Sequence, residues 1–302
     1  MNKNFREFTK EIRQKLQKTL GRKYQFAEKE FDGINGMVKH SLILICAGKD
    51  LHPCINLDKY YSQYKSGVDI DILAEKILES CREDSAISTS SISQFKDWEN
   101  VKPYIYAKLI NTHKNLPLLT KIPNRDYLDL SLVYYVRLES SFTEEYAVVQ
   151  INNEQMQYWG VNEDMLYQSA WSNILNPNEA VVENIANVLS PFFLKNEFKN
   201  TDSKEDIQMY VLSNRCCMNG AVQMCNRKAV WEAAEMLEDD LWILPSSVHE
   251  VILLPVCQTE DCAAGLAEIV KEINNTQLEP NEILSNHVYH YSRKTGEITI
   301  AA

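Results

Sequence analysis

The stretch QMYVLSNRCCMNGAVQMCNRKAVWEAAEMLEDDLWILPSSVHEVILLPV, residues 208–256, is the densest apolar part of the chain and decides its fold. Met209–Leu212 is a short apolar run that ends at polar residues, and Gly220–Val222 resumes it. The pair Asn219-Gly220 favours a turn with positive φ, which joins antiparallel strands. We therefore expect a hairpin over residues 209–222.

The hydrophobic period changes after this hairpin. Val230, Ala233 and Leu237 recur at spacings of three and four residues, which predicts a helix with one buried face. Leu241–Leu244 and Val248–Leu254 are apolar at nearly every position, as in strands covered on both faces. The stretch therefore predicts a buried central sheet with a helix packed on it.

Helical and strand patterns also follow one another before this stretch. Phe5–Leu20 has apolar residues on one side and basic residues around the other, which predicts an amphipathic helix. Tyr24–Phe31 and Met37–Ala47 flank a turn-rich segment and predict a second hairpin. Hydropathy alternates over residues 128–138, so we expect a half-buried strand there.

Two further helices are expected from apolar spacing. One covers residues 95–110 and is broken or kinked near Pro103, because proline removes an internal hydrogen bond. The other begins near Asn178 and ends by Pro191. The fold class is therefore α+β, with mixed or antiparallel sheets built from hairpins and packed helices. A helix, hairpin, helix order recurs along the chain, either as a degenerate repeat or by chance in an α+β chain.

A charged segment near residue 200 is the best linker candidate. Residues 195–206 hold seven charged side chains and a single large apolar one, Phe198. Such composition is typical of a domain boundary. We place a soft boundary there, between an N-terminal α+β domain, residues 1–195, and a C-terminal α+β domain, residues 207–302. One compact unit is the alternative.

Composition indicates a soluble globular protein. The chain has 302 residues, of which 45% are hydrophobic and 24% charged, close to globular averages. No apolar run approaches the length of about 20 residues needed to cross a bilayer. The first residues lack the apolar region and cleavage site of a secretory signal, so we expect a cytoplasmic location.

The cysteines also favour a reducing compartment. All eight lack the Cys-x-x-Cys spacing of a structural zinc site, and the chain is too long to depend on disulfides. We also find no phosphate-binding glycine loop, dinucleotide fingerprint or His-Glu-x-x-His. The sequence therefore indicates neither a metal nor a cofactor.

Charge is distributed unevenly. Residues 1–23 carry eight basic and two acidic side chains, or +6, whereas the whole chain carries −11, so the remainder carries −17. An acidic body repels nucleic acid and anionic membrane, so we expect a protein or a small molecule as partner. The basic helix has three alternatives: packing onto the acidic body, lying on an anionic membrane, or touching nucleic acid. We favour packing, because a single apolar stripe is typical of a core helix.

The polar cluster Ser246, Ser247, His249 and Glu250 is the candidate catalytic site. In a hydrolase, one serine would be the nucleophile, His249 its base and Glu250 the group that orients the base. If residues 248–254 form one strand, His249 and Glu250 lie on opposite faces and cannot pair. We therefore favour serines that satisfy the backbone at a turn and a hydrogen-bonded histidine at the end of a strand.

A second candidate site would bind an anion or a carboxylate. Asn124, Arg125 and Asp126 form its first part, and Asn214 and Arg215 are a second contributor. The guanidinium fork matches a carboxylate, which gives the hypothesis its chemical basis. The alternative, which we favour, is a structural pair of Arg125 with an aspartate near the start of a strand.

Several motifs in the chain are shared with a known family. They are Leu57-Asp58, Pro123-Asn124-Arg125, Trp159-Gly160-Val161, Tyr210-Val211-Leu212-Ser213-Asn214, Gly220-Ala221, and Leu244-Pro245-Ser246-Ser247-Val248-His249-Glu250. On these motifs the chain resembles, nearly end to end, an uncharacterised family of clostridial bacteria called domain of unknown function 5688. The family has no assigned activity, so the resemblance implies a cytoplasmic bacterial origin and no catalytic residue.

The sequence thus leaves two functions to compare. The first is a non-enzymatic intracellular interaction or small-ligand-binding module of a bacterium, because no complete catalytic constellation is visible. The alternative is a hydrolase or transferase with a site around Ser247, His249 and Arg125. Convergence of these three side chains in one pocket would favour the enzyme.

Overall fold

The structure is a computed structural model, which describes residues 3–21, 24–46, 54–84, 96–139, 146–176, 179–189, 208–245, 247–258 and 263–302. Contacts divide the chain into two compact units, residues 1–96 and residues 97–302. The predicted linker, residues 195–206, lies outside the described residues, so the boundary there stays a prediction. The strands on either side of it, β8 (Ala180–Asn184) and β9 (Tyr210–Asn214), are antiparallel neighbours in one sheet.

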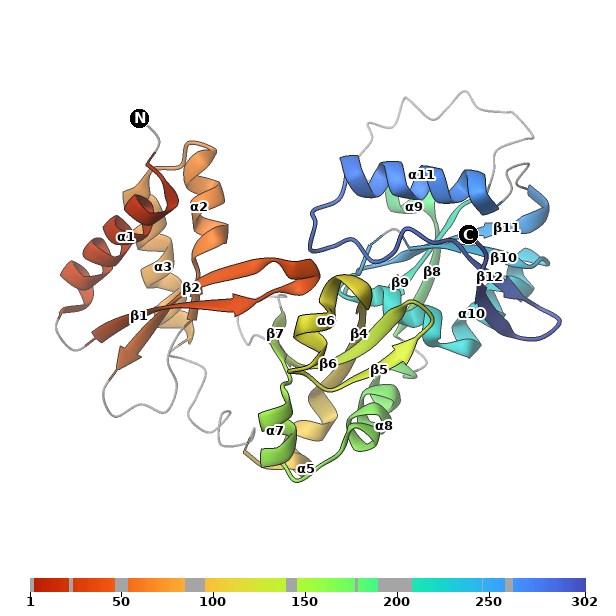
Figure 1. The fold of residues 1–302 in the computed structure, drawn as a ribbon, viewed down its shortest axis with the longest axis horizontal. Helices are drawn as coiled ribbons and strands as arrows, with labels where there is room; N and C mark the ends of the chain where they lie inside the picture. The colour runs from red at the N-terminus through yellow and green to blue at the C-terminus, as the bar shows by residue number, and fades with distance from the viewer. Residues whose placement is uncertain are drawn as a thin grey trace. The chain divides into compact units, whose positions relative to one another are not determined.

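The described residues of the unit 1–96 form a three-stranded antiparallel sheet with three helices packed on it (Figure 1). The sheet order is β1-β2-β3, and the hairpin predicted over β1 and β2 is confirmed. Its loop end extends beyond the helices (Figure 1). The elements are α1 (Phe5–Leu20), β1 (Tyr24–Asp32), β2 (Val38–Cys46), β3 (Cys54–Asn56), α2 (Leu57–Lys65) and α3 (Ile70–Asp84).

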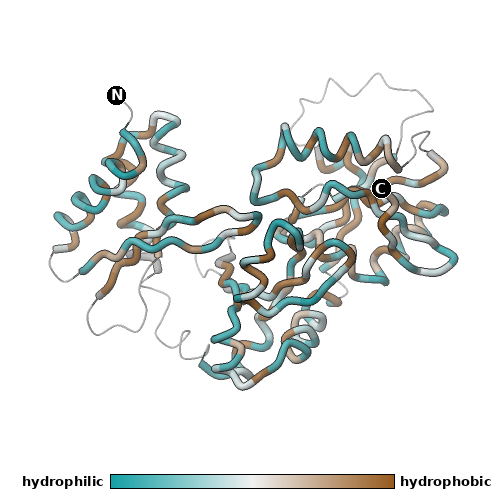
Figure 2. The backbone as a smooth tube through the Cα atoms, viewed as in Figure 1, coloured by the Kyte–Doolittle hydropathy of each residue, from teal (hydrophilic) through white to brown (hydrophobic). Residues whose placement is uncertain are grey.

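The apolar side of α1 forms the core of this unit, as predicted. Phe8, Ile12 and Leu16 are fully buried in one cluster with residues of α3 and the sheet. Figure 2 shows hydrophobic and hydrophilic residues alternating along α1. Asn4 caps the helix by accepting from the Glu7 backbone N–H at 2.9 Å, and the Glu7 side chain accepts from the Asn4 N–H in return. Burying three large side chains in this way fixes which face of α1 meets solvent.

The larger unit, residues 97–302, contains a six-stranded antiparallel sheet of order β13-β12-β10-β11-β9-β8. The predicted strands in the opening stretch become β10 (Leu241–Leu244) and β11 (Val251–Pro255). Both faces of these strands are covered, as predicted: Ile243 and Leu253 are fully buried on one face. The other face packs under α11 (Ala263–Thr276), through Leu266 and Val270.

Helices lie on both sides of this sheet. The predicted amphipathic helix is α10 (Arg227–Leu237), and it lies on the side opposite α11 (Figure 1). A hairpin of β12 (Tyr289–Ser292) and β13 (Glu297–Ile300) completes one edge of the sheet. The short helix α9 (Ile185–Leu189) follows β8. The α+β class with antiparallel sheets built from hairpins is therefore confirmed.

A second sheet of this unit is centred on β6 (Leu130–Glu139). One edge of β6 pairs with β4 (Ile105–Asn111), and its other edge pairs with β5 (Asn124–Tyr127) and then β7 (Tyr146–Gln150). Residues 130–136 are all buried, so the prediction of a half-buried strand was wrong. Helices surround this sheet, and they are α5 (Trp98–Val101), α6 (Leu116–Leu119), α7 (Asn153–Tyr158) and α8 (Glu163–Ile174).

Three other predictions of secondary structure were wrong. Residues 209–222 do not form a hairpin, because β9 pairs with β11 and β8 while Gly220–Cys225 forms the 3-10 helix η5. Residues 95–110 are not one helix, because the chain turns through a short 3-10 helix at Pro103 into β4. The helix expected from Asn178 is replaced by β8 and α9. In each case pairing with a distant strand outweighs local spacing.

Candidate functional site

Ser247 lies in the connection between β10 and β11 and is 3% exposed. Its hydroxyl donates to Glu250 Oε1 at 2.7 Å and accepts from the His249 backbone N–H at 2.9 Å. Strand β11 begins at Val251, so His249 and Glu250 precede the strand and are not held on its opposite faces. The Ser247 hydroxyl closes the turn, in the role that hydroxyls often have at strand ends. Ser246 lies outside the described residues.

The His249 ring has different partners. Its Nδ1 accepts from the Asn219 backbone N–H at 3.2 Å, and its Nε2 lies 3.8 Å from Glu282 Oε1. An imidazole that accepts at Nδ1 carries its proton at Nε2. The Ser247 proton is directed at Glu250, so the serine and the histidine do not form a nucleophile and base pair in this arrangement.

Asn214 and Ser213 connect this cluster to the end of β9. The Ser213 hydroxyl donates to the His249 backbone oxygen at 2.8 Å. Asn214 Nδ2 donates to Met218 O at 2.8 Å, and its Oδ1 accepts from Met218 N, which closes the loop that leads to η5. Arg215 is exposed, and its backbone N–H donates to Glu179 O at 3.2 Å. These contacts assign the Asn214 side chain to the loop rather than to a ligand.

At Gly220 the backbone of η5 comes very close to β9 and to the β10–β11 connection. A Cβ at this position would lie 2.2 Å from Ser213 Oγ, 2.6 Å from His249 O and 2.7 Å from Asn214 N. The glycine therefore allows η5 to pack on both β9 and the β10–β11 connection. Sequence reasoning did not identify Ser213, Asn219 or Glu282 as members of this cluster, and the Asn219-Gly220 turn was the one signal near them.

Arg125 is held by the first turn of α8. Its Nη2 lies 2.6 Å from Glu163 Oε2, its Nε lies 3.1 Å from Glu163 Oε1, and Asp164 accepts a further hydrogen bond. The guanidinium also lies 3.9 Å from the centroid of the Tyr167 ring. The hydrogen bonds to Glu163 raise the pKa of Arg125. Burial, followed by the hydrogen bond to Glu163, raises the pKa of the Tyr134 hydroxyl.

The neighbours of Arg125 do not join it in a binding site. Asn124 Nδ2 donates to the backbone oxygens of Leu119 and Ile122, each at 2.8 Å, and Asp126 is exposed. In the part of the chain that the structure describes, Arg125 shares no hydrogen-bond or ion-pair partner with Ser247 or His249. The residues proposed for a hydrolase or transferase thus belong to separate clusters.

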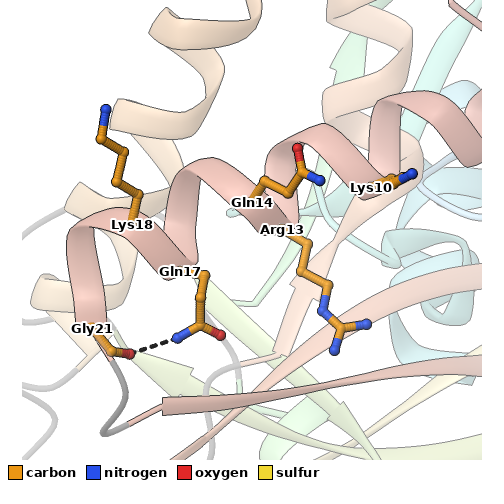
Figure 3. A pocket seen from close by; sticks show the side chains of 6 residues that line it. All are labelled: Lys10, Arg13, Gln14, Gln17, Lys18 and Gly21. Carbon is orange, nitrogen blue, oxygen red and sulfur yellow. Dashed lines mark hydrogen bonds between the residues drawn. The ribbon is translucent and has the colours of Figure 1, made fainter.

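A different site lies on the solvent side of α1, in residues 1–96. We define the cationic face of α1 as Lys10, Arg13, Gln14, Gln17 and Lys18, which with Gly21 line an open hollow of about 580 Å³. Figure 3 shows these side chains projecting from successive turns of the helix, with Gln17 Nε2 donating to Gly21 O at 2.6 Å. The face combines positive charge with amide groups that can donate and accept hydrogen bonds.

Ion pairs neutralise only part of the positive charge of α1. Lys15 is paired with Asp71, and Arg13 Nη1 lies 3.7 Å from Glu28 Oε1. Among the described residues, Arg6, Lys10 and Lys18 have no ion-pair partner, and all three are exposed. These cations remain free to attract an anionic group from outside the unit.

No group of three or more His, Cys, Asp or Glu side chains within the described ranges is placed to hold a metal ion. None of the helices in those ranges combines the length and the apolar character needed to cross a bilayer.

Comparison with known proteins places the chain in a family. No curated protein and no solved structure matches it. The sequence profile of one family matches residues 5–293, which is nearly the whole chain. The chain therefore belongs to the family of unknown function DUF5688.

Proposed function

We propose that the chain is a non-enzymatic interaction protein of the bacterial cytoplasm, which binds an acidic protein partner through the cationic face of α1. The observation that carries this proposal is the exposure of Lys10 and Lys18 beside an open hollow, without an ion-pair partner among the described residues. Free thiols at the described cysteines support a reducing compartment.

The hydrogen bonds of the candidate catalytic residues support binding rather than catalysis. The Ser247 hydroxyl donates to Glu250 within the turn, and the His249 ring accepts from the Asn219 backbone N–H. The Arg125 guanidinium donates to Glu163 of α8. Each polar group therefore has a partner that stabilises the fold. The cationic face differs, because its charges are exposed and directed at solvent.

Two features indicate the class of partner: the apolar side of α1 is buried, and the remainder of the chain is acidic. A membrane-binding helix inserts its apolar side, but Phe8, Ile12 and Leu16 are fully buried in the core of the unit. A nucleic acid presents a row of phosphates much longer than the cationic face, so phosphates outside this face would gain no attraction from a remainder that carries −17. A protein can present a compact group of carboxylates that matches the cationic face without covering the acidic remainder of the chain.

Binding to defined anionic probes tests the proposal. Fluorescence anisotropy would compare a labelled oligo-glutamate peptide, a labelled single-stranded oligonucleotide and vesicles containing phosphatidylserine. We expect the peptide to bind in a salt-dependent way, and the triple variant Lys10→Glu, Arg13→Glu, Lys18→Glu to bind at least about tenfold more weakly. Ser247→Ala and His249→Ala should leave peptide binding unchanged.

A matched control separates the position of the charges from their number. The triple variant Lys39→Glu, Lys59→Glu, Lys76→Glu changes three exposed lysines of the same unit, all outside α1, by the same total charge. It should keep more peptide binding than the α1 variant. Equal losses in the two variants would show that net charge rather than this face is responsible. Preferential binding of the oligonucleotide or the vesicles through α1 would show that the partner class is wrong.

A further inference from the structure

Strand β13 is an open edge of the six-stranded sheet, since in the described part of the chain it pairs with β12 alone. The Ala301 N–H donates to Val288 O at 2.8 Å, on the side of β12. Backbone groups of successive residues in an antiparallel strand point to alternate sides. The N–H and C=O groups of Ile298 and Ile300 therefore point away from β12, to the open edge.

The buried apolar layer of the sheet continues to this edge. Ile243, Tyr289 and Ile300 lie directly opposite one another across β10, β12 and β13. The side chains of Ile243 and Tyr289 are fully buried, whereas Ile300 is 44% exposed. Ile298 lies on the same face of β13 as Ile300 and is half-buried. A strand added beside β13 would therefore extend this layer and cover both isoleucines.

Strand β13 also lacks the charges that usually protect an edge strand from pairing. Ile298, Thr299 and Ile300 are uncharged and β-branched, and Glu297 is the one charged residue of the strand. By contrast, residues 28–30 of the edge strand β1 are all charged. The composition of β13 therefore favours pairing with a further strand.

Pairing of β13 with the same strand of a second copy brings compatible side chains together. An antiparallel pair with its two-fold axis at Thr299 puts Ile298 opposite Ile300 of the second copy, and these residues exchange the backbone hydrogen bonds that point to the open edge. Thr299 then lies opposite Thr299, and Glu297 lies opposite Ala301. No like charges meet, and the β-branched pairs stabilise the contact.

We propose that β13 binds a second copy of the chain, strand to strand, so that the two six-stranded sheets form one continuous sheet. The interface is isologous, because each copy contributes the same strand. It is separate from the cationic face of α1 and does not depend on the function proposed for that face.

Sedimentation velocity of the full chain, at about 0.15 M ionic strength, tests whether the copies associate. Over protein concentrations from about 1 μM to about 1 mM, we expect monomers to give way to dimers, with a dissociation constant below about 1 mM. A chain without detectable dimers at about 1 mM would overturn the proposal.

Substitutions of Thr299 test the position of the two-fold axis. Thr299→Lys puts two ammonium groups opposite each other and Thr299→Glu puts two carboxylates there, so each variant alone should dimerise at least about tenfold more weakly. An equimolar mixture of the two variants should recover dimers, because a lysine then lies opposite a glutamate.

Ser172→Lys and Ser172→Glu are the matched controls, because they make the same changes of charge at an exposed position of α8, away from β13. They should dimerise like the unmodified chain. Dimers that persist in both Thr299 variants, or equal losses in the Ser172 variants, would overturn the proposal. A mixture that stays monomeric would also overturn it, because Thr299 would then not lie opposite itself. Tryptophan fluorescence during urea unfolding would show that each variant is folded.

Discussion

Gly220→Ala is the substitution that tests the central cluster most directly. An added Cβ would meet a hydroxyl at 2.2 Å, a backbone oxygen at 2.6 Å and a backbone nitrogen at 2.7 Å. The hydroxyl of Ser213 can rotate away, but His249 O and Asn214 N belong to the backbone of the β10–β11 connection and of β9. The chain must therefore separate η5 from the sheet to accept a methyl group.

The size of the effect combines two terms. Overpacking in a closely packed site costs about 1 to 3 kcal/mol. Rotation of the Ser213 hydroxyl away from the added Cβ also removes its hydrogen bond to His249 O, which contributes about 0.5 to 1.5 kcal/mol. We expect Gly220→Ala to lower the free energy of unfolding of residues 97–302 by about 2 to 4 kcal/mol.

Tryptophan fluorescence during urea unfolding isolates the unit concerned. All five tryptophans lie in residues 97–302, so their signal reports on this unit and not on residues 1–96. Gly160→Ala is the matched control, because Gly160 has a φ of 66° and no atom within 4 Å of an added Cβ. This control should cost only about 1 kcal/mol through backbone strain.

A double substitution separates the three contacts of Gly220. Ser213→Ala removes the nearest atom but leaves the two backbone atoms in place, so in the Gly220→Ala background it should restore only part of the lost stability. Two results would refute the reasoning. One is a smaller loss for Gly220→Ala than for Gly160→Ala, and the other is full recovery on removing the Ser213 hydroxyl.

Three further predictions concern stability. Burial raises the pKa of four tyrosines of residues 97–302, which stay neutral when folded, whereas the unfolded chain ionises near pH 10. The contribution of these tyrosines to the free energy of unfolding should therefore be fully present below about pH 10. Above that pH it should fall by up to roughly 1.4 kcal/mol per pH unit for each phenol that stays neutral in the folded state. Urea midpoints that stay constant to about pH 11 would contradict this. The four are Tyr127, Tyr134, Tyr135 and Tyr289. Asp129→Asn should cost about 1.5 to 3 kcal/mol by tryptophan fluorescence, because the Asp129 carboxylate accepts from Ser285 Oγ at 2.7 Å and from Tyr289 OH at 2.8 Å. Phe8→Ala should lower the stability of residues 1–96 by about 3 to 5 kcal/mol, measured by circular dichroism, and a loss below about 1 kcal/mol would show that α1 is not part of the core.

Periodicity predicted the elements whose burial depends on one local face. In α10 the buried residues recur every three or four positions, because one side of the helix meets the sheet. In β10 and β11 both faces are covered, so nearly every position is apolar. These patterns follow from a single neighbour or from complete burial, and neither requires knowledge of distant partners.

The remaining elements could not be predicted from local spacing, because they depend on pairing with strands far away in the sequence. The turn chemistry at Asn219 was read correctly, since its φ is 55°, but the residues after it form η5 instead of a second strand. The Ala221 N–H donates to Val248 O at 3.3 Å, and β9 pairs with β11, about 40 residues later. Likewise Ile105 and Leu109 have helical spacing, yet both lie in β4 because β6 offers backbone partners on its open edge. Local spacing cannot show which strand provides these hydrogen bonds.

The candidate sites show the same dependence on distant partners. The sequence placed Ser247, His249 and Glu250 together, but the proton of the serine and the ring of the histidine are directed by Glu250 and Asn219 respectively. The acidic partners of Arg125 come from α8, 38 and 39 residues later in the chain. In the sequence, Glu163 and Asp164 directly follow Asn162, a pattern typical of the first turn of a helix, which is compatible with an ion pair and does not reveal it.

The ion pairs in the structure change what the charge distribution implies about a partner. The sequence assigns +6 to residues 1–23 and −17 to the remainder, which argues against an anionic partner for the chain as a whole. The structure shows that Lys3, Lys15 and Arg13 are paired within their own unit, whereas Lys10 and Lys18 lie exposed on the cationic face of α1. Attraction falls off within about 8 Å at physiological ionic strength. A carboxylate that contacts this face therefore responds to the local lysines more than to any acidic residue beyond that distance, so an acidic partner is compatible with a net negative chain.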